Sequence, residues 1–142
     1  MIRAFADASV IYSAINSRTG ASRELLKRHK TGQIRLVTSQ YALDETKRNI
    51  IRKAPELAIA VDALLTIYDL EIVEATPQRT QEAATYTIRK DAPIVAAAID
   101  AGCPYLLSYD RQHLLGISAV EEGSGLQIIT SGDLLQILEE AD

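Results

Sequence analysis

Three aspartates stand where a metal ion could be bound. Asp7 and Asp110 each follow a short apolar run, and Asp91 directly precedes one. Two carboxylates held close together repel each other, which raises the pKa of one unless a cation neutralises them. Hard divalent cations prefer oxygen ligands of this kind. The acids therefore point to a divalent-cation site, provided that the fold brings them together.

Each acid also has an ordinary explanation on its own, because Asp is favoured at helix N-caps and in turns. Asp91 stands at the N-cap of a helix expected at 92–101, with Pro93 in the first turn and Gly102 as the stop. Asp7 could likewise cap the helix that follows it. The surrounding elements must decide between a cap and a ligand.

Apolar periodicity predicts strands that alternate with helices. The expected strands are 2–6, 34–38, 70–74, 105–108 and 126–130. Helices are expected after Asp7, at 22–30, from the cap Ser39 toward Lys53, at 55–68, 76–90 and 92–101, and from the cap Ser131 to Asp142, with 121–125 as a loop. This alternation predicts an α/β fold, a three-layer α/β/α sandwich with a mainly parallel central sheet, as one domain over residues 1–142.

The carboxyl ends of parallel strands meet at one edge of the sheet, where ligands usually bind. A helix joined by a short loop to a strand runs antiparallel to it, so Asp91 at the helix start and Asp110 at the strand end share that edge with Asp7. Glu45 lies six residues inside its predicted helix, about 9 Å along the axis. Its side chain can reach back, because helical side chains tilt toward the N-terminus. Three carboxylates are therefore expected to converge, and Glu45 can lean toward them. Taken by itself, Glu45 is equally explained as an exposed helix residue, because Glu is a strong helix former.

The composition is that of a globular protein, with 47% apolar and 24% charged residues among 142. The sequence contains no run of eighteen apolar residues and no signal-peptide pattern, so we expect a cytoplasmic protein without membrane contact. The single Cys103 cannot form an internal disulfide and is expected to be a small buried apolar residue.

The net charge of −4 conceals an asymmetry along the chain. Residues 1–53 hold 11 Lys or Arg against 4 Asp or Glu, whereas residues 54–142 hold 4 against 15, so the two parts carry +7 and −11. Such blocks suggest a basic face for a polyanion. An accidental distribution of charges over solvated helices is the alternative, and both stay open.

Four short motifs carry a resemblance to a known family. They are Asp7-Ala8-Ser9, Asp44-Glu45, Asp91 followed by Ala97, Ala98 and Gly102, and Leu106-Leu107-Ser108-Tyr109-Asp110 followed by His113-Leu114-Leu115. Over nearly its whole length the chain resembles the PIN-domain family of metal-dependent ribonucleases, which includes the toxins of many bacterial and archaeal toxin–antitoxin pairs. The last motif is the most specific, because it is similar to the family's Leu-Val-Thr-x-Asp strand end.

The resemblance implies that Asp7, Glu45, Asp91 and Asp110 are the catalytic acids and bind Mg²⁺ or Mn²⁺. Ser9 and Ser108 would support these ligands, and Ser108 stands where Thr is commoner, although both residues supply a hydroxyl. A cation held in this way lowers the pKa of a bound water and stabilises charge on a phosphodiester. Asp100 matches no expected ligand.

The implied activity is that of an endoribonuclease with an RNA substrate, expected as a homodimer, and a toxin of this kind would be paired with an antitoxin. Basic side chains could hold the RNA backbone near the acids. The candidates are Arg23, Lys27, Arg28, Lys47, Arg48 and Arg52. His29 and His113 lack an adjacent orienting acid in the sequence, and His113 is expected in a turn.

Two other functions remain as alternatives. A phosphoacceptor receiver domain also gathers acids at strand ends, but it needs a Lys after its last strand, where this chain has Thr130, Ser131, Gly132 and Asp133. A non-catalytic protein- or RNA-binding module on the same fold is the stronger rival. The presence of all four acids argues against it.

Overall fold

The computed structural model describes residues 1–141, so Asp142, where the last helix is predicted to end, lies outside the described residues. The strands are β1 (Ile2–Ala6), β2 (Ile34–Thr38), β3 (Glu71–Ile72), β4 (Tyr105–Leu107) and β5 (Gln127–Ile129). The helices are α1 (Ala8–Asn16), α2 (Ala21–Lys30), α3 (Gln40–Lys53), α4 (Ala58–Tyr68), α5 (Pro77–Ala83), α6 (Ala92–Asp100), α7 (Ser118–Ser124) and α8 (Ser131–Glu140), with a 3₁₀ turn, η1 (Pro55–Leu57), before α4.

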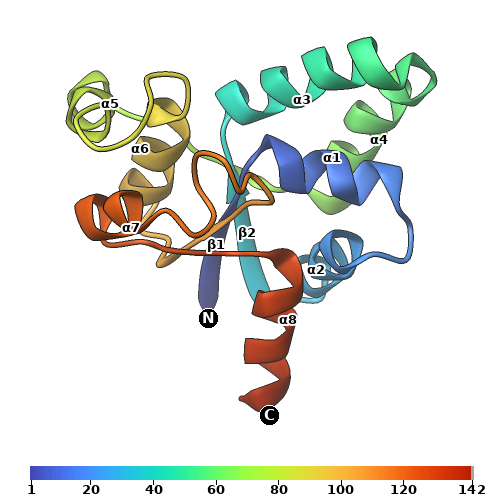
Figure 1. Cartoon of the computed structure of the whole chain (residues 1–142). Coiled ribbons are helices and arrows are strands. Elements are labelled where there is room, and N and C mark those ends of the chain that lie inside the picture. The colour runs from blue at the N-terminus through green and yellow to red at the C-terminus, as the bar shows by residue number, and fades with distance from the viewer. Residues whose placement is uncertain (142) are drawn as a thin grey trace.

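The five strands form one sheet in the order β3-β2-β1-β4-β5, and every neighbouring pair is parallel. Helices α1 and α3 lie to one side of β1 and β2 in Figure 1, and α5, α6 and α7 lie to the other. The predicted three-layer α/β/α sandwich with a parallel sheet is confirmed.

The central strand β1 lies in the middle of the hydrophobic core. Phe5 pairs with Val37 of β2 and Leu106 of β4, and none of the three side chains is exposed to solvent. A parallel sheet covered on both faces requires such apolar strands, because neither face meets water.

The chain leaves β1 first toward β2 and later returns to pair β4 on the other side. This reversal of strand order is a topological switch point, where open α/β sheets form a crevice at the carboxyl ends of the strands. The backbone N–H of Asp7 donates to the carbonyl of Leu107 over 3.2 Å, so the ends of β1 and β4 lie side by side.

The predicted helix 76–90 is too long. Helix α5 ends at Ala83, and the chain turns over residues 84–91 before α6 begins. The ring of Tyr86 in this segment packs so closely on Gly123 that a Cβ at position 123 would overlap it. The segment after α5 therefore packs against α7 and does not continue the helix.

The predicted loop 121–125 is wrong, because α7 runs through most of it and ends at Gly125, whose φ of +76° suits a left-handed helix stop. The cap of α8 is Thr130 and not Ser131. The Thr130 hydroxyl accepts from the N–H of Asp133, whose carboxylate accepts from the N–H of Thr130, a capping box. Strands β3, β4 and β5 are shorter than predicted, and the helix predicted at 55–68 divides into η1 and α4.

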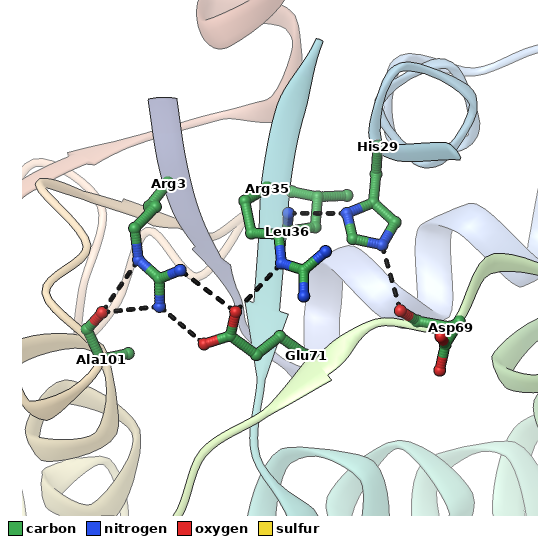
Figure 2. Close-up of polar contacts among 7 residues, drawn as sticks. All are labelled: Arg3, His29, Arg35, Leu36, Asp69, Glu71 and Ala101. Carbon is green, nitrogen blue, oxygen red and sulfur yellow. Dashed lines mark hydrogen bonds and ion pairs between the residues drawn. The ribbon is translucent and has the colours of Figure 1, made fainter. Parts of the chain in front are cut away.

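A cluster of charges, the arginine–glutamate cluster, lies toward the amino ends of β1 and β2 and is drawn in Figure 2. Arg3 and Arg35 are register partners on β1 and β2, and both bind Glu71 of β3. Arg3 donates to Glu71 Oε1 and Oε2 over 3.1 and 2.7 Å, and Arg35 Nε donates to Oε1 over 3.0 Å. Hydrogen bonds from Arg3 and Arg35 lower the pKa of Glu71 to about 2. Arg3 also donates to the carbonyl of Ala101 at the end of α6.

The buried His29 joins three elements beside this cluster (Figure 2). Its Nδ1 accepts from the N–H of Leu36 over 3.0 Å, and its Nε2 lies 3.2 Å from the carbonyl oxygen of Asp69. Because Nδ1 is an acceptor, the proton of the neutral ring is on Nε2, where it is donated to Asp69. His29 therefore ties α2 to β2 and to the end of α4.

Cys103 is buried, as predicted, and burial raises the pKa of its thiol to about 11. Within residues 1–141, the structure contains no helix that combines the length and the apolar character needed to cross a membrane.

Candidate metal centre

The four acids singled out by the sequence line one cleft of about 160 Å³ at the carboxyl edge of the sheet. Asp7 comes from the end of β1, Glu45 from α3, Asp91 from the start of α6 and Asp110 from the segment after β4. The expected convergence is therefore observed, and the use of these acids as metal ligands stays a prediction. The other lining residues are Ala8, Ser9, Tyr12, Asn49, Lys53, Ile94 and Leu114.

Asp7 is both a helix cap and a wall of the cleft. Its Oδ1 accepts from the hydroxyl of Ser9 over 2.6 Å and from the N–H of Val10 over 3.1 Å. Burial raises the pKa of Asp7 to about 6, against the lowering effect of hydrogen bonds from Ser108, Ser9 and Val10, and repulsion from Glu45 adds to the rise. The carboxylate is thus held in place but is short of positive charge.

Two hydroxyls fix the backbone around Asp110. Ser9 accepts from the N–H of Tyr109 over 2.9 Å, and the fully buried Ser108 accepts from the N–H of Asp110 over 3.0 Å. Ser9 therefore links Asp7 to the segment after β4. Both serine hydroxyls are therefore placed to orient the carboxylates that are expected to bind the metal.

Asp91 stands at the N-cap position of α6, but its side chain makes no capping hydrogen bond. Its Oδ2 is buried and has no hydrogen-bond partner among residues 1–141. Burial, then repulsion from Asp110, raises the pKa of Asp91, while Lys90 and His113 oppose the rise. A buried carboxylate oxygen without a partner destabilises the fold unless a cation satisfies it. The predicted cap is therefore right in position and wrong in its side-chain contact.

The two carboxylate oxygens of Asp110 have different surroundings. Its Oδ1 accepts from the N–H groups of Gln112 and His113, a turn typical of Asp. The turn brings Nδ1 of His113 to 3.5 Å from Asp110 Oδ2 and 4.0 Å from Asp91 Oδ2. One ligand atom from each of these three residues lies within 4.8 Å of the others. The turn at His113 was predicted, whereas its contact with the acids was missed.

Glu45 reaches the cleft from inside α3, and its Oε2 lies 3.7 Å from Nζ of Lys90. Tyr41, one turn earlier, donates its hydroxyl to the carbonyl of Lys90 over 2.7 Å. These contacts join α3 to the segment that delivers Asp91. Asn49 follows Glu45 on the same helix face and was also missed, although its spacing of four residues could have revealed it.

The protein-family model described as PIN domain matches residues 3–112 of the sequence. The chain belongs to the PIN-domain family. A search by sequence among curated proteins finds no significant match.

Solved structures with low sequence identity share this PIN-domain fold. VapC20 from Mycobacterium tuberculosis, described as a sarcin–ricin loop cleaving toxin, is 19% identical with a TM-score of 0.61 over 77% of this chain and 91% of that one. PAE2754 from Pyrobaculum aerophilum is 17% identical with a TM-score of 0.63 over 98% of each chain. VapBC2 from Rickettsia felis, bound to a promoter DNA fragment, is 14% identical with a TM-score of 0.62 over 89% of this chain and 97% of that one.

In this PIN domain, Asp100 lies outside the cleft, consistent with its lack of a match among the ligands. Its carboxylate accepts from the N–H of Thr76 over 2.9 Å and from Arg79 Nε over 3.1 Å. Burial alone would raise the pKa of Asp100, but these hydrogen bonds outweigh it, and the pKa is lowered. Asp100 therefore stabilises the start of α5.

The six basic residues predicted to bind RNA are spread over the PIN domain, and several have partners within the chain. Arg23 donates to the Ala14 carbonyl, Arg28 donates to Gln33 and lies 4.0 Å from Glu24, Lys47 lies 3.3 Å from Asp62, and Arg52 donates to Asn49. Lys27 and Arg48 are exposed on α2 and α3. Arg28 lies beside Gln33, just before β2 and thus at the edge opposite the cleft. An RNA-binding role for this set stays a prediction.

Proposed function

We propose that this PIN domain is a metal-dependent endoribonuclease in which Asp7, Glu45, Asp91 and Asp110 hold the cation. The observation that carries the proposal is the gathering of four carboxylates in one cleft around the partnerless Oδ2 of Asp91. Asp7 and Asp91 both have raised pKa values there, so a divalent cation would relieve the strain that burial and repulsion impose.

The ligand chemistry fits Mg²⁺ or Mn²⁺, because both cations prefer carboxylate oxygens, and a neutral imidazole at His113 would suit Mn²⁺ better than Mg²⁺. When bound, such a cation supplies an activated water and neutralises charge on the phosphodiester. The residues of the chain then have separate tasks. Ser9 and Ser108 hold the acids in position, and Lys53 on the cleft wall attracts the negatively charged backbone of the substrate.

RNA is the proposed substrate, and a toxin role is proposed with it. VapC20 is described as a toxin that cleaves the sarcin–ricin loop, and VapBC2 is a toxin–antitoxin assembly by its name, so an antitoxin protein is the partner that we propose for this chain. A homodimer, a cytoplasmic location and a single nuclease domain over residues 1–142 belong to the same proposal.

The test is cleavage of a mixed RNA pool by purified wild type and Asp7→Asn protein, each with Mg²⁺, with Mn²⁺ and with a chelator. We expect cleavage by the wild type only when metal is present, and none by Asp7→Asn. The matched control is Asp100→Asn, which removes a carboxylate outside the cleft and should leave cleavage unchanged.

Metal-dependent cleavage that survives both Asp7→Asn and Asp110→Asn would contradict the proposal. If the wild type neither cleaves RNA nor binds Mn²⁺ in a calorimetric titration, the chain is a non-catalytic module on the same fold.

A further inference from the structure

One wall of the cleft carries no acid. It is formed by Tyr12 of α1 with Asn49 and Lys53 of α3. Lys53 Nζ lies 5.7 Å from the centre of the Tyr12 ring, within the range of a cation–π contact. Within residues 1–141, Lys53 has no acidic partner at ion-pair distance. Tyr12 is half-buried against the core, so its ring is already held in one place.

The three cleft residues of α3 are spaced by four and therefore share one face of the helix. Glu45, Asn49 and Lys53 follow one another over about 12 Å of helix axis, at 1.5 Å per residue. This face changes from acidic beside the candidate metal centre to neutral and then to basic. Arg52 donates to Asn49 Oδ1 over 2.8 Å, which orients the amide and adds a second positive charge at the basic end. A strand of phosphates leaving the acids would meet this end.

We propose that Tyr12, Asn49 and Lys53 form a subsite for an unpaired nucleotide next to the scissile phosphate. The inference rests on the nuclease function proposed above and specifies which part of the substrate that site holds. The base stacks on the Tyr12 ring, and the Lys53 ammonium moves from the ring to the adjacent phosphate. Exposed aromatic rings beside basic side chains are the usual platform for single-stranded nucleic acid, whereas bases in a duplex are already stacked on each other.

A second tyrosine–lysine pair in the same chain provides a matched control. Lys30 Nζ lies 5.9 Å from the centre of the Tyr68 ring, and Tyr68 lines a different hollow together with Leu57 and Ile67. This pair has similar geometry, but no acid within residues 1–141 lines its hollow. A general effect of losing a tyrosine or a lysine would therefore appear equally at both pairs.

The experiment measures binding of a short fluorescein-labelled single-stranded RNA by fluorescence anisotropy. The parent protein is Asp7→Asn, which prevents cleavage during the titration. Adding Tyr12→Leu should weaken binding roughly 10-fold, and adding Tyr12→Phe should not. Adding Lys53→Gln should reduce the slope of log K against log salt by about 1. The Tyr68→Leu and Lys30→Gln variants should bind like the parent, and a duplex RNA of the same sequence should bind more weakly.

Unchanged RNA affinity in Tyr12→Leu would overturn the subsite, as would an equal loss in Tyr68→Leu. Circular dichroism and thermal unfolding exclude misfolding of the Tyr12 variants, and the exposed Lys53 tests the same subsite without touching the core. Cleavage by the wild type, measured in parallel with Mn²⁺, separates the two proposals. Cleavage together with unchanged binding by Tyr12→Leu overturns the subsite alone, whereas Tyr12-dependent binding without cleavage overturns the nuclease alone.

Discussion

The two ends of the sheet surround acidic side chains in opposite ways. In the arginine–glutamate cluster, Glu71 receives hydrogen bonds from two arginines, and its pKa falls to about 2. At the carboxyl edge, about 13 Å farther along β1, Asp7 receives only hydroxyl and amide hydrogen bonds, and its pKa rises to about 6. Here the ammonium of Lys90 lies 3.7 Å from Glu45, and Nδ1 of His113 lies 3.5 and 4.0 Å from Asp110 and Asp91.

The difference shows that the cleft acids lack arginine partners for a reason other than a shortage of arginine in this chain. The same fold supplies arginines to one carboxylate and leaves four others facing one another. A cluster of this kind destabilises the protein without metal, and a bound cation would remove that penalty. The carboxyl edge is therefore organised for a charge that comes from outside the chain.

The largest effect on RNA cleavage should follow from removing a carboxylate at the carboxyl edge of the sheet, and not from removing one in the arginine–glutamate cluster. Asp110→Asn is expected to reduce metal-dependent RNA cleavage roughly 1,000-fold, because it removes a proposed ligand with little change of volume. Glu71→Gln should leave cleavage within about twofold while lowering the free energy of unfolding by about 1 kcal/mol. Rates under single-turnover conditions measure the first change, and urea unfolding measures the second. Equal losses of activity in both variants would remove the functional distinction between the edges.

The pH dependence of stability should have opposite signs at the two edges. Asp7 has a pKa of about 6 in the folded chain and near 3.8 in the unfolded chain, so the folded chain holds the proton more tightly. In metal-free protein, the contribution of Asp7 to the free energy of unfolding should therefore fall by about 3 kcal/mol as the pH rises from about 4 to 6. The pKa of Glu71 is lowered, so its contribution is gained as the pH rises from about 2 to 4.5.

Urea unfolding in chelator across this pH range tests the sign at Asp7, with the wild type and Asp7→Asn compared at each pH. The substitution should stabilise the metal-free protein at pH 7 and have little effect at pH 4. If Asp7→Asn destabilises the protein at pH 7, burial does not hold the Asp7 proton as described.

His29 should contribute to the stability of the fold and not to metal binding. His29→Leu leaves the buried N–H of Leu36 without an acceptor and is expected to lower the free energy of unfolding by about 2 kcal/mol. Mn²⁺ affinity, measured by calorimetry, should stay unchanged because His29 lies outside the cleft. A large loss of affinity would mean that the two ends of the sheet are coupled.

The smallest effect is expected at Glu45, which reaches the cleft from inside a helix. Glu45→Gln should weaken Mn²⁺ binding about 10-fold, since the other three acids remain. Asp44→Asn, at the exposed neighbouring position, is the control and should bind Mn²⁺ like the wild type. Identical affinities for Glu45→Gln and wild type would remove Glu45 from the ligand set.

Much of the cleft could be predicted because its acids are placed by strand ends. Once a parallel sheet was inferred, Asp7 and Asp110 had to share its carboxyl edge, and Asp91 followed from the antiparallel packing of its helix. The helical rise and the tilt of its side chain showed only that Glu45 can reach the cleft, and the family resemblance was needed to select it. The three aspartates depend on backbone rules that a single sequence is enough to apply.

The missed features depend on contacts between distant segments. His113 turns toward the acids because Asp110 accepts from its N–H, and α5 ends early where Tyr86 packs on Gly123. Residues 121–125 suggested a loop because Gly123 and Gly125 are unfavourable inside helices. Tyr12 lies three residues after Ser9, so its spacing is compatible with the cleft, but its contact with Lys53 of α3 could not be inferred from the sequence.

The central position of β1 has a consequence for biosynthesis. Its first residues leave the ribosome early, whereas its partner β4 begins only at Tyr105. Until β4 pairs with β1, Asp110 has no fixed position beside Asp7, so a partly synthesised chain lacks the assembled cleft. A domain that folds as its chain emerges would therefore complete its acidic cleft only after the segments from β1 to Asp110 have all been made.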